Sequence, residues 1–162
     1  MAKQKEEKTN VMRILEQRGI AFTAHTYEHE EGVAVDGVTV AASLGQDPEC
    51  VFKTLVARGA SNNIYVFVIP VADSLDLKKA ARAVGEKSIE MVAVKEINAL
   101  TGYVRGGCSP VGMKKEYPTV FHETAEIVDT IMVSAGKIGF QVELAPRDLM
   151  DLVGASTADV TV

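Results

Sequence analysis

A short loop at residues 104–115, VRGGCSPVGMKK, concentrates residue types that occur in catalytic and ligand-binding sites. It contains three glycines, a thiol, a hydroxyl and a proline, and it ends in two lysines. Three kinds of structure use such a composition: a phosphate-binding loop, a nucleophile elbow and an ordinary turn between elements. Each has its own spacing, so the spacing decides among them.

The spacing of this loop excludes the first two. A phosphate-binding loop needs GxxxxGK[ST], but after Gly107 and Gly112 the lysine comes one position late, at Lys114, and no Ser or Thr follows it. A nucleophile elbow needs GxSxG, and Ser109 has no glycine two positions later. What remains is an ordinary turn, or a loop whose backbone N–H groups are open to an oxygen atom of a ligand because glycine has no side chain to block them.

Cysteine and histidine offer two further kinds of chemistry. Cys108 would need a neighbouring base or cation to act as a nucleophile, and nothing in the sequence places a histidine beside it, so a structural thiol is favoured. His25 and His29 have the i, i+4 spacing of a zinc helix, but their segment has strand character, and four strand residues span about 13 Å. The sequence therefore predicts no metal site, and it assigns no role to His25, His29 or His122.

Lys53 interrupts the apolar run 51–56, VFKTLV. On a strand its side chain shares a face with Val51, Leu55 and Ala57, and that face should look toward the core or a pocket. A lysine in this place extends its ammonium group to solvent, pairs with another group, or points into a pocket that receives a carbonyl or phosphate. The residues alone leave these interpretations open.

Helices and strands, intermixed along the chain, must position these side chains. Helical patterns cover 8–18 (capped by Thr9 or Asn10), 39–45, 74–85 (capped by Ser74 and ended by Gly85), 94–102, and 146–153 from Pro146. Strand patterns cover 20–29, 51–58, 63–71, 88–94, 130–134 and 139–145, and the second and third should form a hairpin. Because the elements follow no regular βαβ order, we expect an α+β fold: a mixed, mostly antiparallel, barrel-like sheet with helices packed around it.

Length and composition indicate one globular domain over residues 1–162, with residues 1–8 flexible. No apolar run is long enough to span a bilayer, and the N-terminus lacks the apolar core of a signal peptide, which predicts a cytoplasmic protein with free thiols at Cys50 and Cys108. The net charge of −5 disfavours a general nucleic-acid binder. A local basic face is still compatible with the lysines and arginines of the second half.

Five blocks of the sequence together resemble the YbaK/EbsC family: HTYEHEEG, VFKTLVAR, VIPVADSLDLKKAARAVGEKSIEM, TGYVRGGCSPVGMKK and MVSAGKIGFQVEL. They occur in family order from about residue 11 to about residue 153. The family contains free-standing bacterial editing proteins, best known as Cys-tRNA(Pro) deacylases and related to the editing domain of prolyl-tRNA synthetase. The resemblance implies the fold expected above and hydrolysis of the ester that joins a mischarged amino acid to tRNA(Pro). It implies no cofactor, and it names the acceptor end of tRNA(Pro) and prolyl-tRNA synthetase as partners.

The resemblance also implies a site. Lys53 matches the pocket lysine of the family, and the glycine loop matches its G-x-x-x-P loop. The loop residues that would hold the carbonyl oxygen are Gly106, Gly107, Cys108 and Ser109. The residues that would contact the rest of the substrate are Tyr27, Pro110, Ser134 and Gln141.

Two positions depart from the family pattern. Relatives can carry an aspartate where this chain has Gln141, and they often carry an aliphatic residue where it has Cys108, which speaks against a protein-thiol nucleophile. The reaction implied by the resemblance is instead substrate-assisted: the cysteinyl thiol attacks its own carbonyl carbon and leaves as a cyclic thioester.

Two alternatives remain open on the sequence. A pocket that selects cysteine by one methylene or thiol gains only about 1–3 kcal/mol of discrimination, so the substrate could be Ala-tRNA(Pro) or another small aminoacyl-tRNA. The chain could also be a non-catalytic module that binds aminoacyl-adenosine or a nucleotide. The sequence does not determine the oligomeric state.

Overall fold

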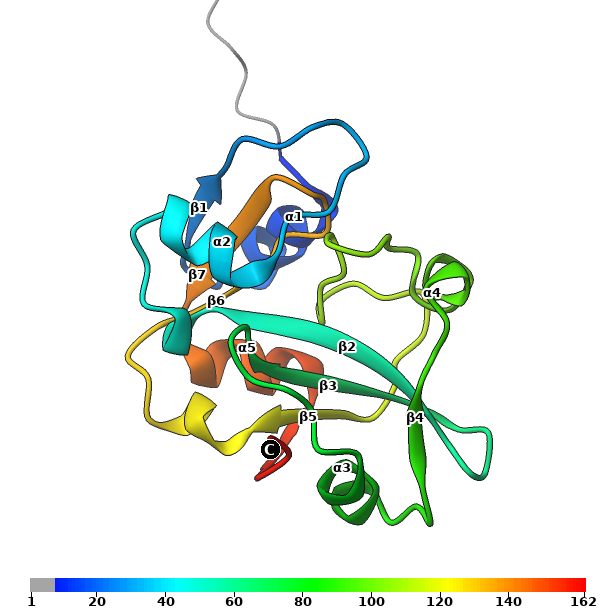
Figure 1. The fold of residues 1–162 in the computed structure, drawn as a ribbon. Helices are drawn as coiled ribbons and strands as arrows, with labels where there is room; N and C mark the ends of the chain where they lie inside the picture. The colour runs from blue at the N-terminus through cyan, green and yellow to red at the C-terminus, as the bar shows by residue number, and fades with distance from the viewer. Residues whose placement is uncertain (1–7) are drawn as a thin grey trace, which may run out of the picture.

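The computed structural model describes residues 8–162, which form two β-sheets with helices around them (Figure 1). The expected flexible segment, residues 1–8, falls outside this range except for Lys8, whose ammonium group lies 3.1 Å from the Glu16 carboxylate. No helix within residues 8–162 is both long enough and apolar enough to cross a membrane.

The helices lie where the sequence patterns predict them: α1 (Asn10–Gln17), α2 (Gly37–Ser43), α3 (Leu77–Val84), α4 (Val94–Thr101) and α5 (Pro146–Val153). Thr9 caps α1 by accepting the Met12 N–H, as predicted. The predicted cap of α3 is wrong. Asp76, rather than Ser74, accepts the first backbone N–H groups of that helix, because the helix begins only at Leu77.

The strands form two sheets. The smaller one has the order β1 (Phe22–Thr26), β7 (Phe140–Leu144) and β6 (Ile131–Ser134), all antiparallel. The larger one has the order β4 (Ile89–Met91), β2 (Phe52–Gly59), β3 (Ile64–Pro70), β5 (Thr119–His122) and β8 (Ser156–Ala158). The predicted β2–β3 hairpin is confirmed, whereas β5 and β8, which pair in parallel with their neighbours, were not predicted.

Together these elements confirm the expected α+β class with a mixed, mostly antiparallel arrangement. Two 3₁₀ turns, Pro48–Cys50 and Glu123–Glu126, complete the secondary structure of the described residues. The sheets are open and share a buried core that includes Phe52, Val66, Phe121, Val133 and Val142. The barrel-like character is loose, because the sheets do not close on themselves.

The joint between the two sheets creates an uncovered strand edge. Val51, just before β2, forms an isolated bridge to Met132 of β6, and β2 pairs with β4 only from Ala57 to Gly59. Between these two attachment points, no strand of the described chain pairs with the side of β2 that faces away from β3. Residues 52–55 lie along this uncovered edge, and they form one wall of the cavity described next.

Candidate active site

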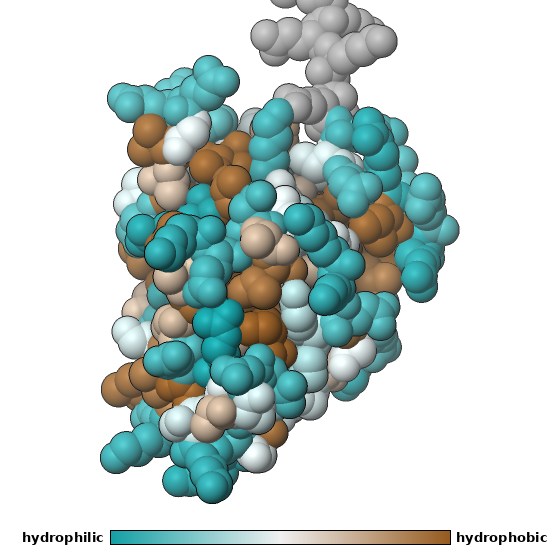
Figure 2. Space-filling model, turned by 90° about the vertical axis from the view of Figure 1, so that its right-hand side faces the viewer, coloured by the Kyte–Doolittle hydropathy of each residue, from teal (hydrophilic) through white to brown (hydrophobic). Residues whose placement is uncertain are grey.

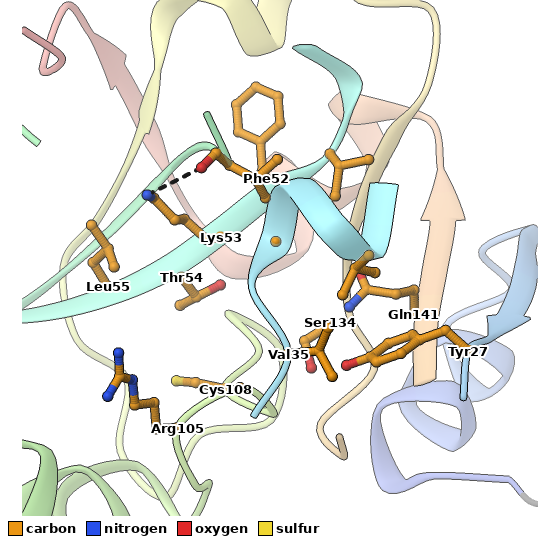
Figure 3. Close-up of a pocket in the computed structure, with 15 residues that line it drawn as sticks. Tyr27, Val35, Phe52, Lys53, Thr54, Leu55, Arg105, Cys108, Ser134 and Gln141 are labelled. Atoms are coloured by element: carbon orange, nitrogen blue, oxygen red, sulfur yellow. Dashed lines mark hydrogen bonds between the residues drawn. The ribbon is translucent and has the colours of Figure 1, made fainter. Parts of the chain in front are cut away.

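A cavity of about 170 Å³ lies along the uncovered edge of β2 (Figure 3). Its walls come from β2, from α2 and the segment before it, from the glycine loop, and from the ends of β1, β6 and β7. The lining residues are Tyr27, Val35, Gly37, Val40, Val51, Phe52, Lys53, Thr54, Leu55, Val71, Arg105, Gly106, Cys108, Ser134 and Gln141.

The charged side chains of this lining are all positive. Lys53 and Arg105 supply cationic groups, while none of the described lining residues is an Asp, a Glu or a His. Carboxylates and imidazoles are the usual general bases of hydrolytic sites. The cavity therefore offers positive charge and hydrogen-bond donors to a substrate, but it lacks the ordinary groups that would activate a water molecule.

Lys53 is half-buried on β2, and its ammonium group donates a hydrogen bond of 3.2 Å to the Val71 carbonyl oxygen (Figure 3). An ammonium group has three donors, so two remain for a ligand. The ammonium group of this lysine therefore pairs with the chain that follows β3, and its side chain lines the cavity.

The glycine loop is packed tightly between two neighbouring segments. Gly106 has a left-handed φ of 85°, and a Cβ atom there would lie 2.7 Å from the Cβ of Ala34. A Cβ atom at Gly107 would lie 3.0 Å from the backbone nitrogen of Ile138. The first contact is too short for a real side chain, and the second could be relieved only by moving backbone. Both positions therefore require glycine to bring the loop against residues 34 and 137–138.

The backbone N–H groups of the loop are not all available to a ligand. Gly107 donates its N–H to the Val104 carbonyl oxygen at 3.0 Å, which closes a turn. Within residues 8–162 the N–H groups of Gly106 and Cys108 have no hydrogen-bond partner. Both residues line the cavity, so these two groups are the candidate oxyanion donors.

Three of the predicted site residues do not line this cavity. Gly107 is buried against the 137–138 backbone, as described above. Ser109 is fully buried, and its hydroxyl accepts the Val111 N–H at 3.3 Å. Pro110 lines a second cavity, of about 460 Å³, together with Val111 and Lys115. A direct role in the first cavity therefore falls to Gly106 and Cys108 among the loop residues.

Cys108 is poorly suited to act as a nucleophile. Burial raises the pKa of its thiol to about 11, and a hydrogen bond with Thr101 opposes this only in part. At pH 7 a thiol with that pKa is ionised to about one part in ten thousand. Cys108 thus lines the cavity as a neutral group, in agreement with the structural role favoured by the sequence.

Polar side chains close the other end of the cavity. Figure 3 shows the Tyr27 hydroxyl pointing toward Ser134, whose own hydroxyl accepts the Gly136 N–H at 3.2 Å. The carboxamide oxygen of Gln141 and the hydroxyl of Thr54 are buried, and neither has a hydrogen-bond partner among residues 8–162. Buried polar atoms are rarely left unpaired, so both are candidates to bind substrate.

Thr54 and Arg105 were not among the site residues predicted from the sequence. Strand alternation places Thr54 on the face opposite Lys53, so the pattern offered no reason to group the two. The uncovered edge of β2 brings both into the lining. The only signal for Arg105 in the sequence was its place in the glycine loop as a basic residue.

The three histidines lie outside the cavity lining. His25 pairs with Glu143 at 2.9 Å, and His29 packs edge-on against the Tyr27 ring. His122 is buried and accepts the Val160 N–H at 3.2 Å. In the described part of the chain, no cluster of three or more His, Cys, Asp or Glu side chains is arranged to hold a metal ion.

The chain is similar in sequence to a known domain family and to a bacterial relative. The aminoacyl-tRNA editing domain family matches residues 32–152. A relative from Enterococcus faecalis, EbsC, named as a proposed Cys-tRNA(Pro)/Cys-tRNA(Cys) deacylase, is 44% identical over 162 residues, which cover 99% of this chain and 98% of the relative.

Solved structures agree in fold. A proposed trans-editing enzyme for prolyl-tRNA synthetase superposes with a TM-score of 0.80 at 24% identity, covering 97% of this chain and 99% of that one. A protein described only as hypothetical reaches a TM-score of 0.83 at 24% identity, covering 94% and 99%. The match to the editing domain spans most of the cavity-lining residues, and the relative from Enterococcus faecalis extends it to nearly the full length of the chain. The chain therefore belongs to the aminoacyl-tRNA editing domain family.

Proposed function

We propose that this aminoacyl-tRNA deacylase acts on Cys-tRNA(Pro) and that the thiol of the substrate is the nucleophile. The observation that carries the proposal is the cavity lining, which combines cationic groups and N–H donors with no carboxylate or imidazole among the described residues. The one protein thiol in the lining, Cys108, is neutral at physiological pH because burial raises its pKa to about 11. A reaction in such a site has to draw its nucleophile from elsewhere.

A cysteinyl ester supplies one. Its sulfur forms a bond to the carbonyl carbon, the bond from that carbon to the ribose oxygen breaks, and the thiol proton passes to the ribose oxygen. The products are a cyclic thioester of cysteine and a tRNA with a free terminal hydroxyl, and water then opens the thioester. An aminoacyl ester is already reactive, so the protein contributes by holding the reacting atoms in place and by stabilising the developing charge.

Each cavity residue has its own role in the proposed reaction. The two unused donors of the Lys53 ammonium group hold the carbonyl or the terminal adenosine, and the N–H groups of Gly106 and Cys108 stabilise the carbonyl oxygen as it gains negative charge. Tyr27 and Ser134 bound the space for the amino acid. The unpaired oxygens of Thr54 and Gln141 accept hydrogen bonds from its α-ammonium group. The neutral Gln141 does this without the charge of an aspartate.

The partners follow from the same proposal. The chain works as one editing domain over residues 1–162, in the cytoplasm, on the acceptor end of tRNA(Pro). The name of EbsC includes Cys-tRNA(Pro), and the solved neighbour is described as a trans-editing enzyme for prolyl-tRNA synthetase. We therefore propose prolyl-tRNA synthetase as the partner that selects the tRNA, which would compensate for the net charge of −5 of this protein.

A panel of mischarged tRNAs tests the proposal. Cys-tRNA(Pro) and Ala-tRNA(Pro) are incubated with the purified protein, alone and with prolyl-tRNA synthetase, and release of the amino acid is followed over time. Release of cysteine but not alanine supports the proposal, and faster release with the synthetase supports the partnership. Release of alanine at a similar rate would contradict the thiol mechanism, and no release from either tRNA would indicate a binding module.

A further inference from the structure

Two neighbouring segments of the cavity wall carry opposite charges. Residues 28–49, which contribute Val35, Gly37 and Val40 to the lining, contain six acidic residues and no Lys or Arg. All six are exposed: Glu28, Glu30, Glu31, Asp36, Asp47 and Glu49. This acidic segment repels a polyanion from one side of the cavity.

The glycine loop, which packs against this segment at Ala34, carries the opposite charge. Residues 102–115 contain Arg105, Lys114 and Lys115 and no acidic residue. All three side chains are exposed, and within residues 8–162 none has an ion-pair partner. We call these three residues the basic rim. By contrast, the cationic side chains of Arg58 and Lys79 are bound to carboxylates at 3.1 and 2.9 Å.

Arg105 and Lys114 connect the basic rim to the cavity, whereas Lys115, at the other end of the rim, lines the second cavity. Arg105 lines the cavity itself. The Lys114 N–H donates to the Thr101 carbonyl oxygen at 3.1 Å, and the Lys114 side chain runs along Gly102, where a Cβ atom would lie 3.3 Å from its Cγ. Two residues lie between Gly102 and Arg105, so the Cα atoms of these two residues are at most about 11 Å apart. The rim therefore leads from the cavity along the C-terminal end of α4.

The surface around α4 suits a polar partner. Figure 2 faces the side of the molecule on which α4 and the β2–β3 turn lie, and hydrophilic residues there break the apolar ones into separate patches. A nucleic-acid strand binds mainly through its phosphates and needs unpaired Lys and Arg side chains, whereas a stable protein interface has an apolar centre.

We propose that the sugar-phosphate backbone of the tRNA acceptor strand reaches the cavity across the basic rim and stays clear of the acidic segment. The inference rests on the proposed function, because it assumes that a tRNA end occupies the cavity. Arg105 binds the phosphate nearest the terminal adenosine, and Lys114 and Lys115 bind phosphates further along the strand. The rim thus gives a protein of net negative charge a defined direction of approach for its substrate.

The test measures binding of an uncharged acceptor-stem RNA ending in CCA, by fluorescence anisotropy over a series of salt concentrations. The variant Lys114→Gln/Lys115→Gln removes two rim charges. The matched control, Lys78→Gln/Lys87→Gln, removes two exposed and unpaired charges, one on α3 and one between α3 and β4. Each lost phosphate contact reduces the slope of log K against log salt by about 0.7–0.9.

We expect the rim variant to bind the RNA more weakly with a shallower slope, by about 1.4–1.8 for two contacts, while the control matches the wild-type protein. Equal slopes for the rim variant and the wild type would overturn the inference, and so would an equal loss in the control. The readout needs no turnover. A wild-type protein that binds the RNA across the rim but releases no cysteine from Cys-tRNA(Pro) would refute the proposed reaction and leave this surface standing.

Discussion

The ammonium group of Lys53 and the thiol of Cys108 line the same cavity but are suited to different tasks. Lys53 carries a charge on a half-buried strand residue, with one hydrogen bond to Val71 and two donors to spare. Cys108 is held neutral by burial. In the proposed reaction the lysine therefore binds substrate, and the thiol only fills space.

Replacing Lys53 with alanine removes a cation of the cavity lining that, in the proposed reaction, binds the substrate. We expect Lys53→Ala to lower the rate of Cys-tRNA(Pro) deacylation by about 10²–10³-fold, the loss typical of an electrostatic donor in an active site. The fold should persist, because the side chain makes one hydrogen bond and no ion pair among the described residues. Circular dichroism checks the fold, and Lys78→Ala, an exposed lysine on α3, is the control. Near-normal turnover by Lys53→Ala would remove this residue from the site.

Replacing Cys108 with serine should leave deacylation within about threefold of the wild-type rate, since the change keeps a small neutral side chain. Because burial raises the pKa of this thiol to about 11, its alkylation by iodoacetamide should also accelerate about tenfold per pH unit between pH 7 and 9. Mass spectrometry of the Cys108 peptide measures this rate. A folded but inactive Cys108→Ser variant would instead point to a covalent protein-thiol mechanism.

The glycine loop has a packing requirement set by the neighbouring backbone. Gly107 touches the backbone of the 137–138 turn. At Gly154, the C-cap of α5, a Cβ atom would have no neighbouring atom within 4 Å, so glycine is required there only for its φ of 63°. Gly107 therefore has a packing requirement next to the cavity, whereas Gly154, which does not line this cavity, has only a conformational requirement.

We expect Gly107→Ala to displace the loop and to lower deacylation by up to about 10²-fold, because small misplacements of a catalytic group cost rate steeply. Gly154→Ala should cost about 1–2 kcal/mol of unfolding free energy, the penalty of a left-handed conformation with a Cβ atom, and leave activity unchanged. Urea denaturation measures the stability of both variants. If the two lost activity only in proportion to stability, the loop would have no specific role in positioning the substrate.

Local sequence patterns predicted the elements that are formed by interactions between residues close in sequence. Apolar periodicity located the five helices, although the N-cap of α3 was assigned to Ser74 and is Asp76. The β2–β3 hairpin followed from two β-rich runs around a short turn. Length does not separate the strands that were missed from those that were predicted, because β5 and β8 have four and three residues, as do the predicted β6 and β4. What β5 and β8 share is parallel pairing. Their parallel pairing depends on partners far away in sequence, which no local pattern can indicate.

The same limit applies to the site. Lys53 was a candidate from its own neighbours, since a charge in an apolar run is a local signal. Tyr27, Ser134 and Gln141 could be joined to it only through the family resemblance, because they lie on strands of the other sheet or at their ends. Thr54 was missed because the edge on which it lies is left unpaired by long-range strand pairing.

In the molecule as a whole, the cavity results from the way in which the two open sheets meet. The Val51–Met132 bridge joins them, and the gap beside it leaves an edge that α2 and the glycine loop cover only in part. This arrangement provides cations and backbone donors, but no acid or imidazole among the described lining residues. The proposed chemistry therefore depends on what the substrate itself brings.

A comparison of Cys-tRNA(Pro) with Ser-tRNA(Pro) tests that claim most directly, because the two substrates differ only in sulfur against oxygen. Single-turnover release of each amino acid is measured with saturating wild-type protein. We predict rapid release of cysteine and release of serine no faster than in buffer alone, since a hydroxyl is a far weaker nucleophile than a thiol near neutral pH. Release of serine at a rate close to that of cysteine would contradict the account, because the protein would then have to supply the nucleophile.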